Sequence, residues 1–286
     1  MTFAIPKTRY NGEVDRNLQL FQQLALSPGV SLAHAALCLA RLEYPRLDLS
    51  HCLEWLKRKG AALSATYRSE ESVVDRIQRL NLFLYQQEGF RPNIENYYDP
   101  RNSYLNDVIE RKLGIPISLA ILYMDLAHCL HLKLNGVGFP GHFLIRNTET
   151  AVFYIDPFHS GQILLREDCE SRFREATGGH LPFSDEHLRS ASKVQILIRM
   201  LGNLWNIFAK QNRLDRAIEV LNWAIAIQPE APVHFRDRGL LLARMECPEV
   251  ALKDLQYYLE SLPLTTERAQ IERLIQTLRG GRTTIH

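Results

Sequence analysis

The amino-acid sequence predicts an α+β protein with a helical N-terminal region, a core that contains a short antiparallel sheet, and an all-α C-terminal module. Apolar residues recur at helical spacing through most of the first ninety residues. A nearly all-apolar helix that starts at Pro116 precedes short strand-like runs, and a helical pattern with an internal repeat begins near residue 193. The predicted regions are residues 1–100, 101–190 and 191–286.

Composition and charge narrow the class of protein. Of the 286 residues, 46% are hydrophobic and 23% are charged, which is typical of a soluble globular protein. The net charge is +2 with Lys and Arg spread along the chain, so we expect no nucleic-acid partner. The apolar run "ISLAILYM" is far shorter than the roughly twenty residues of a membrane span, so we expect no membrane partner. Five scattered cysteines without a C-x-x-C pattern, and no visible secretory signal, predict a cytoplasmic protein with free thiols.

The N-terminal region contains three segments with an apolar stripe at helical spacing, "VSLAHAALCLARLEY", "LSHCLEWLKRKGAAL" and "VVDRIQRLNLFLYQQ". Ser69 precedes acidic residues and is a candidate N-cap for the third of them. Residues 92–106 are rich in Asn, Pro and Tyr and predict a loop. The short helix "LNDVIERKL" follows, and Gly114 is expected to cap its C-terminal end.

The predicted core begins with a buried helix. Pro116 fits the first helical position, which needs no N–H partner, and the helix is almost wholly apolar through Leu126. Strands are predicted within "KLNGVGF", "HFLIR" and "VFYIDP", and "GQILLRED" is a candidate for a fourth. Residues 166–190 are polar and irregular, and we expect them to form a linker.

The C-terminal region repeats with a period of 34 residues. Equivalent pairs are Phe208 and Leu242, Ala217 and Ala251, Leu221 and Leu255, and Pro229 and Pro263. This period, with a small residue in the second helix and a closing proline, resembles the tetratricopeptide repeat (TPR). A capping helix that ends at Gly280–Gly281 is expected after the second repeat.

The segment "GVGFPGHFLIRN" carries His142, and "VFYIDPF" carries Asp156. A histidine before one strand and an aspartate at the end of the next fit a general base and the group that orients it. Ser118 lies at the start of the buried helix, where a nucleophile is near unpaired helix N–H groups. Each residue also fits a structural role: Ser118 as a helix cap, His142 as a loop residue, and Asp156 as a turn former.

The run "NSYLNDVIERKLGIPISLAILY … GVGFPGHFLIR … YIDPF" resembles the bacterial transglutaminase-like/tetratricopeptide family of the SirB type, whose members are described as regulators of sirC expression. The resemblance covers roughly residues 30–280 and implies a transglutaminase-like (papain-like) core followed by TPR. It implies that His142 and Asp156 occupy the histidine and aspartate positions of the triad. Ser118 stands where the thiol enzymes have cysteine, so the triad is a relic or a serine version of it. Asn106, Arg111 and His159 are the candidate pocket-lining residues.

Two functions fit these features. The first is a non-catalytic or weakly active protein that acts in protein–protein interaction or regulation, with a protein or peptide partner held in the TPR groove. Arg236, Arg238 and Arg244 would bind an acidic peptide there, or would be solvated or paired with Asp237 and Glu246. The alternative is a Ser-His-Asp hydrolase or acyltransferase that acts on amide or ester bonds. His128 and His131 have metal-ligand spacing but no evident third ligand, so we expect no metal or cofactor.

Overall fold

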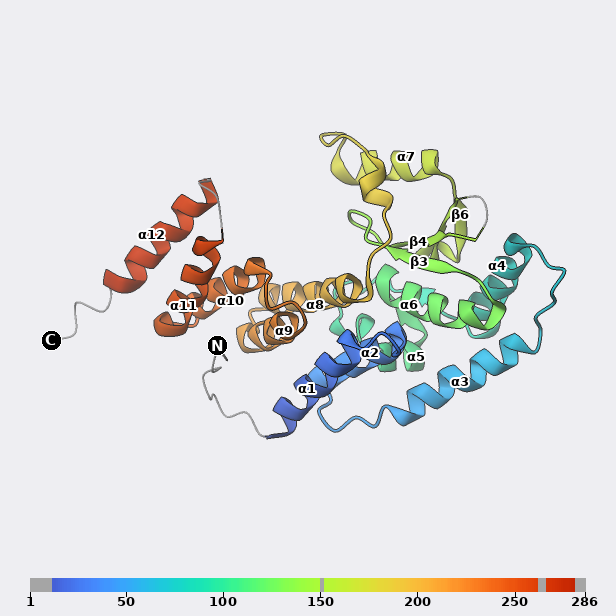
Figure 1. Cartoon of the computed structure of the whole chain (residues 1–286), viewed down its shortest axis with the longest axis horizontal. Coiled ribbons are helices and arrows are strands. Elements are labelled where there is room, and N and C mark those ends of the chain that lie inside the picture. The colour runs from blue at the N-terminus through green and yellow to red at the C-terminus, as the bar shows by residue number, and fades with distance from the viewer. Residues whose placement is uncertain (1–11, 150–151, 262–265, 281–286) are drawn as a thin grey trace. The chain divides into compact units, whose positions relative to one another are not determined.

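The computed structural model describes residues 12–149, 152–261 and 266–280 of the chain (Figure 1). The chain folds into two compact units. One comprises residues 23–200, and the other comprises the C-terminal part from residue 201 together with the N-terminal residues up to 22. The α+β fold class predicted from the sequence is confirmed. Among the described helices, none is long and apolar enough to cross a membrane.

The N-terminal helices follow the apolar stripes of the sequence. They are α1 (Gly12–Leu26), α2 (Leu32–Cys38), α3 (Ser50–Ser64) and α4 (Val73–Asn81), and a π-helical turn over Leu82–Gln87 extends α4. The expected N-cap at Ser69 is wrong, because the N-cap of α4 is Ser72, three residues later. The Ser72 hydroxyl accepts the N–H of Asp75, and the Asp75 carboxylate accepts the N–H of Ser72. This reciprocal pair satisfies two helix-end donors, which Ser69 cannot reach.

The segment before the core contains helix α5 (Leu105–Arg111) between two short strands, β1 (Arg91–Pro92) and β2 (Leu113–Gly114), which pair in parallel. The expected cap at Gly114 is also wrong. Lys112 takes the left-handed conformation that ends α5, with φ of 60°. Gly114 instead makes room for the next helix, because a Cβ at this position would lie 2.8 Å from the Ser118 hydroxyl oxygen.

The core is a four-stranded antiparallel sheet in the order β3-β4-β5-β6. The strands are β3 (Leu134–Val137), β4 (Leu144–Asn147), β5 (Tyr154–Asp156) and β6 (Gln162–Leu164). The buried helix α6 (Pro116–Ala127) packs against β3 and β4, and Pro116 is in its first turn, as expected. Figure 1 shows α6 and α7 (Arg166–Thr177) on opposite sides of the sheet.

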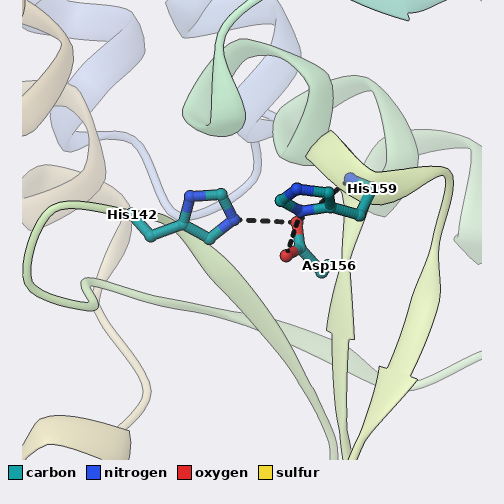
Figure 2. Close-up of side chains that lie close together, drawn as sticks. All are labelled: His142, Asp156 and His159. Carbon is teal, nitrogen blue, oxygen red and sulfur yellow. Dashed lines mark hydrogen bonds and ion pairs between the residues drawn. The ribbon is translucent and has the colours of Figure 1, made fainter. Parts of the chain in front are cut away.

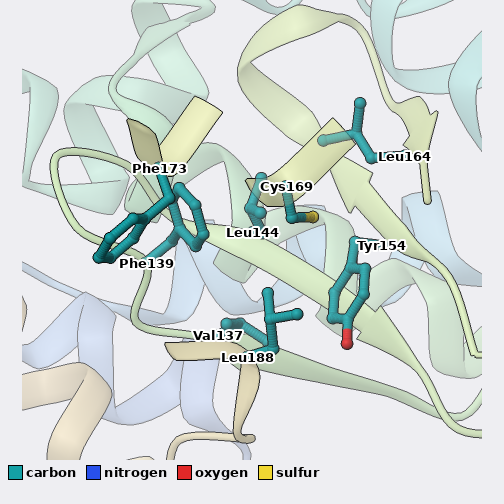
Figure 3. Close-up of a cluster of buried hydrophobic side chains, with 8 residues drawn as sticks. All are labelled: Val137, Phe139, Leu144, Tyr154, Leu164, Cys169, Phe173 and Leu188. Carbon is teal, nitrogen blue, oxygen red and sulfur yellow. The ribbon is translucent and has the colours of Figure 1, made fainter. Parts of the chain in front are cut away.

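Helix α7 corrects the sequence analysis, which expected a linker over residues 166–190. Only Cys169 and Phe173 of this helix are fully buried, so its apolar stripe is one residue wide and its composition is that of a loop. The two side chains complete a hydrophobic cluster with residues of the sheet and of the segment that follows α7 (Figure 3). Its other members are Val137, Phe139, Leu144, Tyr154, Leu164 and Leu188.

The C-terminal helices are α8 (Lys193–Lys210), α9 (Leu214–Ile227), α10 (Pro232–Arg244), α11 (Pro248–Glu260) and α12 (Thr266–Gly280). The repeat-equivalent residues Ala217 and Ala251 are fully buried, which explains their small size. Gly239 allows α10 and α11 to approach closely, because a Cβ there would lie 2.9 Å from Leu255. Pro263 and Gly281 lie outside the described residues.

Candidate functional site

The pairing of β4 with β5 brings a histidine and an aspartate together. Ile145 in β4 lies opposite Ile155 in β5 in antiparallel register. His142 precedes β4 and Asp156 ends β5, so their side chains meet at the same edge of the sheet. The Nε2 atom of His142 lies 2.8 Å from Oδ1 of Asp156 (Figure 2). An ionised carboxylate only accepts hydrogen bonds, so this pair requires a proton on Nε2.

Asp156 is the centre of a larger cluster. Its side chain is fully buried, and the Nδ1 atom of His159 lies 2.7 Å from its second oxygen, Oδ2. The Arg172 guanidinium also donates to Oδ2, while the backbone N–H groups of Phe158 and His159 donate to Oδ1 at 3.0 and 3.3 Å. Burial raises the pKa of Asp156, but the hydrogen bonds and charges of His142 and His159 outweigh it and hold the pKa below its usual value. The carboxylate is therefore ionised at neutral pH.

A cavity of about 530 Å³ lies beside this cluster. It is lined by residues 139–142, His159, and one face of α7 with Arg172, Glu175 and Ala176. Both imidazoles and the guanidinium therefore border a space that a small molecule or a side chain could enter. Asp156 lies behind them and is not among the lining residues.

Partly buried side chains hold the two loops that carry the histidines. The Tyr85 hydroxyl donates to the carbonyl of Pro157 at 2.8 Å, and the Asn81 amide donates to the carbonyl of Gly161 at 3.1 Å. Burial raises the pKa of Tyr85 well above its usual value, so its hydroxyl remains a donor. On the other side, the Arg199 guanidinium donates to the carbonyls of Phe139 and His142. These bonds satisfy backbone groups that loops otherwise expose to water.

Ser118 lies in the first turn of α6 and is fully buried. Its hydroxyl accepts the N–H of Ile115 at 3.0 Å and donates to the carbonyl of the same residue at 3.1 Å. Within the described residues, no hydrogen bond joins Ser118 to His142, and Ser118 is not among the residues that line the cavity beside His142. The structure therefore brings His142 and Asp156 together and gives Ser118 a local partner.

The three candidate pocket residues lie in different surroundings. His159 lines the cavity beside His142. Arg111 ends α5 and approaches Asn102 and Asp99, at 3.4 Å in each case. Asn106 is on the same helix, and its buried side-chain oxygen has no hydrogen-bond partner among the described residues.

A second cavity, of about 540 Å³, lies in the C-terminal unit. We call it the repeat groove. Its lining residues lie on α8, α10 and α12. Helices α8 and α10 are the first helices of the two repeats, and α12 follows the second repeat. The lining residues are Trp205, Ala209, Asp237, Leu240, Leu241, Ala243, Arg244, Leu274 and Leu278.

The three arginines expected to bind a peptide differ in their contacts. Arg238 bonds Asp254 through two nitrogens, at 2.7 and 2.8 Å, and bonds Asn222 through the third. Arg236 pairs with Asp237 and Glu267. Arg244 is exposed, borders the repeat groove and makes one long bond to Asn212 at 3.3 Å. Of the three, Arg244 has the guanidinium most accessible to a partner.

Comparison with known proteins places this architecture in a family. Residues 50–202 match the transglutaminase-like superfamily, and residues 204–279 match the tetratricopeptide repeat. A UPF0162 protein of Xylella fastidiosa is 37% identical over 245 residues, which cover 82% of this chain and 85% of that relative. The chain belongs to the UPF0162 family. A UPF0162 protein of Vibrio cholerae is 29% identical over 225 residues, covering 78% of this chain and 80% of the relative. Protein SirB1 of Salmonella typhimurium is 25% identical over 268 residues, which cover 93% of this chain and 97% of that relative. The resemblance inferred from the sequence motifs is confirmed.

Sequence analysis of this UPF0162 protein missed Arg172, because the segment that carries it was expected to be a linker. Signals for a helix were present. Asp168 stands where it can accept the N–H of Leu165 at 2.8 Å, Cys169 and Phe173 are four residues apart, and Gly178 ends the helix with a left-handed φ of 62°. A search for helix caps in polar segments would have found α7, and with it the arginine on Asp156.

Proposed function

We propose that this UPF0162 protein binds a protein partner through the repeat groove, and that its transglutaminase-like core does not catalyse acyl transfer. The repeat groove carries the proposal, because apolar side chains from three non-consecutive helices converge on one concave surface. Stacked repeats commonly bind an extended segment of a partner on such a surface. On this proposal the protein is a cytoplasmic regulator that acts by association.

The chemistry of the groove indicates what it would hold. Trp205, Leu240, Leu274 and Leu278 are partly exposed within it, so apolar side chains of a bound segment can displace water there. Arg244 adds one exposed positive charge at the border. We therefore propose an amphipathic segment, with apolar residues in the groove and an acidic residue beside Arg244.

The arrangement around Ser118 supports a core without acyl-transfer activity. A serine needs an aligned base to become a nucleophile, whereas a cysteine is already partly ionised at neutral pH. Here the Ser118 hydroxyl is buried and bonded to Ile115, and His142 is bonded to Asp156. The hydroxyl thus serves the start of α6, and the histidine borders a cavity without a serine or cysteine in its lining.

The groove is tested with the full chain as bait and quantitative proteomics of the captured proteins. Leu240→Glu places a charge in the groove and should reduce capture of a specific partner at least tenfold. Val233→Glu is the matched control, because Val233 is exposed on the same helix and does not line the groove. Thermal unfolding of both variants establishes that they fold. A partner whose capture is equal for wild type and Leu240→Glu would overturn the groove as the binding surface.

The Ser-His-Asp hydrolase remains the second candidate because of the 2.8 Å contact between His142 and Asp156. A fluorophosphonate probe reacts with activated serines, so it separates the two candidates. We expect no labelling of Ser118 in the wild-type protein. Labelling at Ser118 that disappears in the His142→Ala variant would establish the hydrolase instead.

A further inference from the structure

We propose that His142, Asp156 and His159 form a binding site for a divalent transition-metal ion of the zinc class. The two ring nitrogens and a carboxylate oxygen all lie within 4.8 Å of one another. Figure 2 shows both imidazoles directed at the same carboxylate. The ring centroids are 5.8 Å apart. The site shares no residue with the repeat groove, so it is independent of the partner binding proposed above.

Two histidines on one carboxylate exceed what a base and its orienting group require. Such a pair needs one imidazole on the aspartate. Here His142 and His159 approach different oxygens of Asp156, at 2.8 and 2.7 Å. A base and its orienting group use only His142, whereas a metal site uses both histidines.

The hydrogen bonds of Asp156 lead to the same inference. A carboxylate has about four acceptor positions. Five donors lie against this one: two imidazoles, the Arg172 guanidinium and two backbone N–H groups. A metal ion removes the excess, because it replaces the two imidazole protons and uses the nitrogen lone pairs directly. The backbone N–H groups of Phe158 and His159 then orient the carboxylate as outer partners.

The geometry suits zinc more than magnesium or calcium. Zinc binds imidazole nitrogen and carboxylate oxygen at about 2.0–2.2 Å, so neighbouring ligand atoms of a tetrahedral site lie about 3.5 Å apart. The nitrogen–oxygen contacts of 2.8 and 2.7 Å must therefore widen slightly when the ion enters. Asp156 is fixed, but the His159 side chain is 56% exposed on a turn and can make this adjustment. Two imidazoles and one carboxylate leave a coordination position open, and the cavity lined by both histidines provides space for it. Magnesium and calcium prefer oxygen ligands alone.

One group opposes the ion. The Arg172 guanidinium on Oδ2 places a positive charge beside the proposed cation, while Glu175 in the same cavity wall contributes a negative charge. Arg172 should therefore weaken metal binding. Replacing Arg172 should therefore raise the affinity for the ion, a result that a purely structural histidine cluster would not give.

The test uses the full chain, stripped of metal with a chelator and titrated with Co²⁺ and then Zn²⁺. Binding of Co²⁺ to a nitrogen–oxygen site of low coordination number gives visible absorption, and Zn²⁺ should displace it at one ion per chain. His159→Ala and His142→Ala should each weaken Zn²⁺ binding at least tenfold, and Arg172→Gln should strengthen it at least threefold. His159 is largely exposed, so its replacement leaves the core intact.

Two controls exclude other ligands. His131→Ala removes the other histidine pair of metal-ligand spacing, and Cys247→Ser removes the exposed thiol; both should bind Zn²⁺ as wild type does. Binding that is unchanged in His142→Ala and His159→Ala, or no Co²⁺ absorption in the wild type, would overturn the site. An affinity that is unchanged or lower in Arg172→Gln would overturn the opposing effect assigned to the Arg172 charge.

Discussion

The Ser118 hydroxyl oxygen accepts the N–H of Ile115 at 3.0 Å, in the buried first turn of α6. The bond satisfies a donor that the helix itself leaves unpaired. A side chain that acts in this way is part of the fold, whatever its position relative to His142. Its removal should therefore be detectable as a loss of stability.

Ser118→Ala should lower the free energy of unfolding by about 1 kcal/mol, the usual cost of a lost helix cap. The measurement is urea denaturation followed by circular dichroism. Ser64→Ala is the control, because Ser64 is exposed at the end of α3 and should change stability by less than about 0.5 kcal/mol. Equal stability of Ser118→Ala and wild type would show that the hydroxyl is dispensable to the helix.

The cysteines should react in an order set by burial. Burial raises the pKa of Cys38 to about 11 and that of Cys169 to about 12, whereas Cys247 is exposed. Because the thiolate is the reactive form, iodoacetamide at pH 7.5 should modify Cys247 first and leave Cys38 and Cys169 unmodified in the folded protein. Peptide mass spectrometry measures this, and Cys247→Ser should lack the fast reaction. Modification of Cys169 at the rate of Cys247 would contradict the burial of the Cys169 side chain beneath α7.

Arg238 and Arg244 should separate folding from partner binding. Arg238→Met leaves the buried Asp254 carboxylate without its pair and should cost about 3–5 kcal/mol. Arg244→Met removes an exposed charge and should change stability by less than about 0.5 kcal/mol. Arg244→Met should nevertheless weaken partner capture, while its melting temperature stays that of wild type. The reverse pattern, with Arg244 needed for stability and Arg238 dispensable, would be inconsistent with the contacts of α10.

The stability of the repeat unit should depend on pH through His234. Burial lowers the pKa of this histidine, whose Nε2 lies 3.1 Å from Oε1 of Gln228. Below about pH 6.5 the unfolded chain binds a proton that the folded chain resists, so stability is present above that pH and is lost as the pH falls. The slope cannot exceed about 1.4 kcal/mol per pH unit for one group.

Urea midpoints between pH 5 and pH 7.5 test this dependence. His234→Gln should flatten the curve, and His180→Gln, which changes an exposed histidine, should not. If the urea midpoint of the wild-type protein does not change over this pH range, the predicted contribution of His234 to the pH dependence of stability is wrong.

The strands and the buried helix of the core were predictable because their patterns are strong: an all-apolar helix after Pro116, and short apolar runs between glycines. Helix α7 was not predicted because only two of its residues, Cys169 and Phe173, are fully buried. Long-range partners were harder still. The sequence suggested that His142 and Asp156 are neighbours, but not that Arg172 joins them or that Arg238 is held by Asp254. Spacing along the chain does not fix which charges meet after folding. The division at residues 100 and 190 stays a prediction.

Helix α8 has a consequence for genetics. It runs without interruption from Lys193 to Lys210. Near its start, Lys193 donates to the carbonyls of Leu24 and Val30, and Arg199 holds the loop of His142. Trp205, on the same helix, lines the repeat groove. A gene truncated at codon 191 would lose the repeats and the support of the histidine loop together. Its phenotype could not be assigned to either loss alone, whereas a point mutation at Arg199 or at Leu240 changes one of the two.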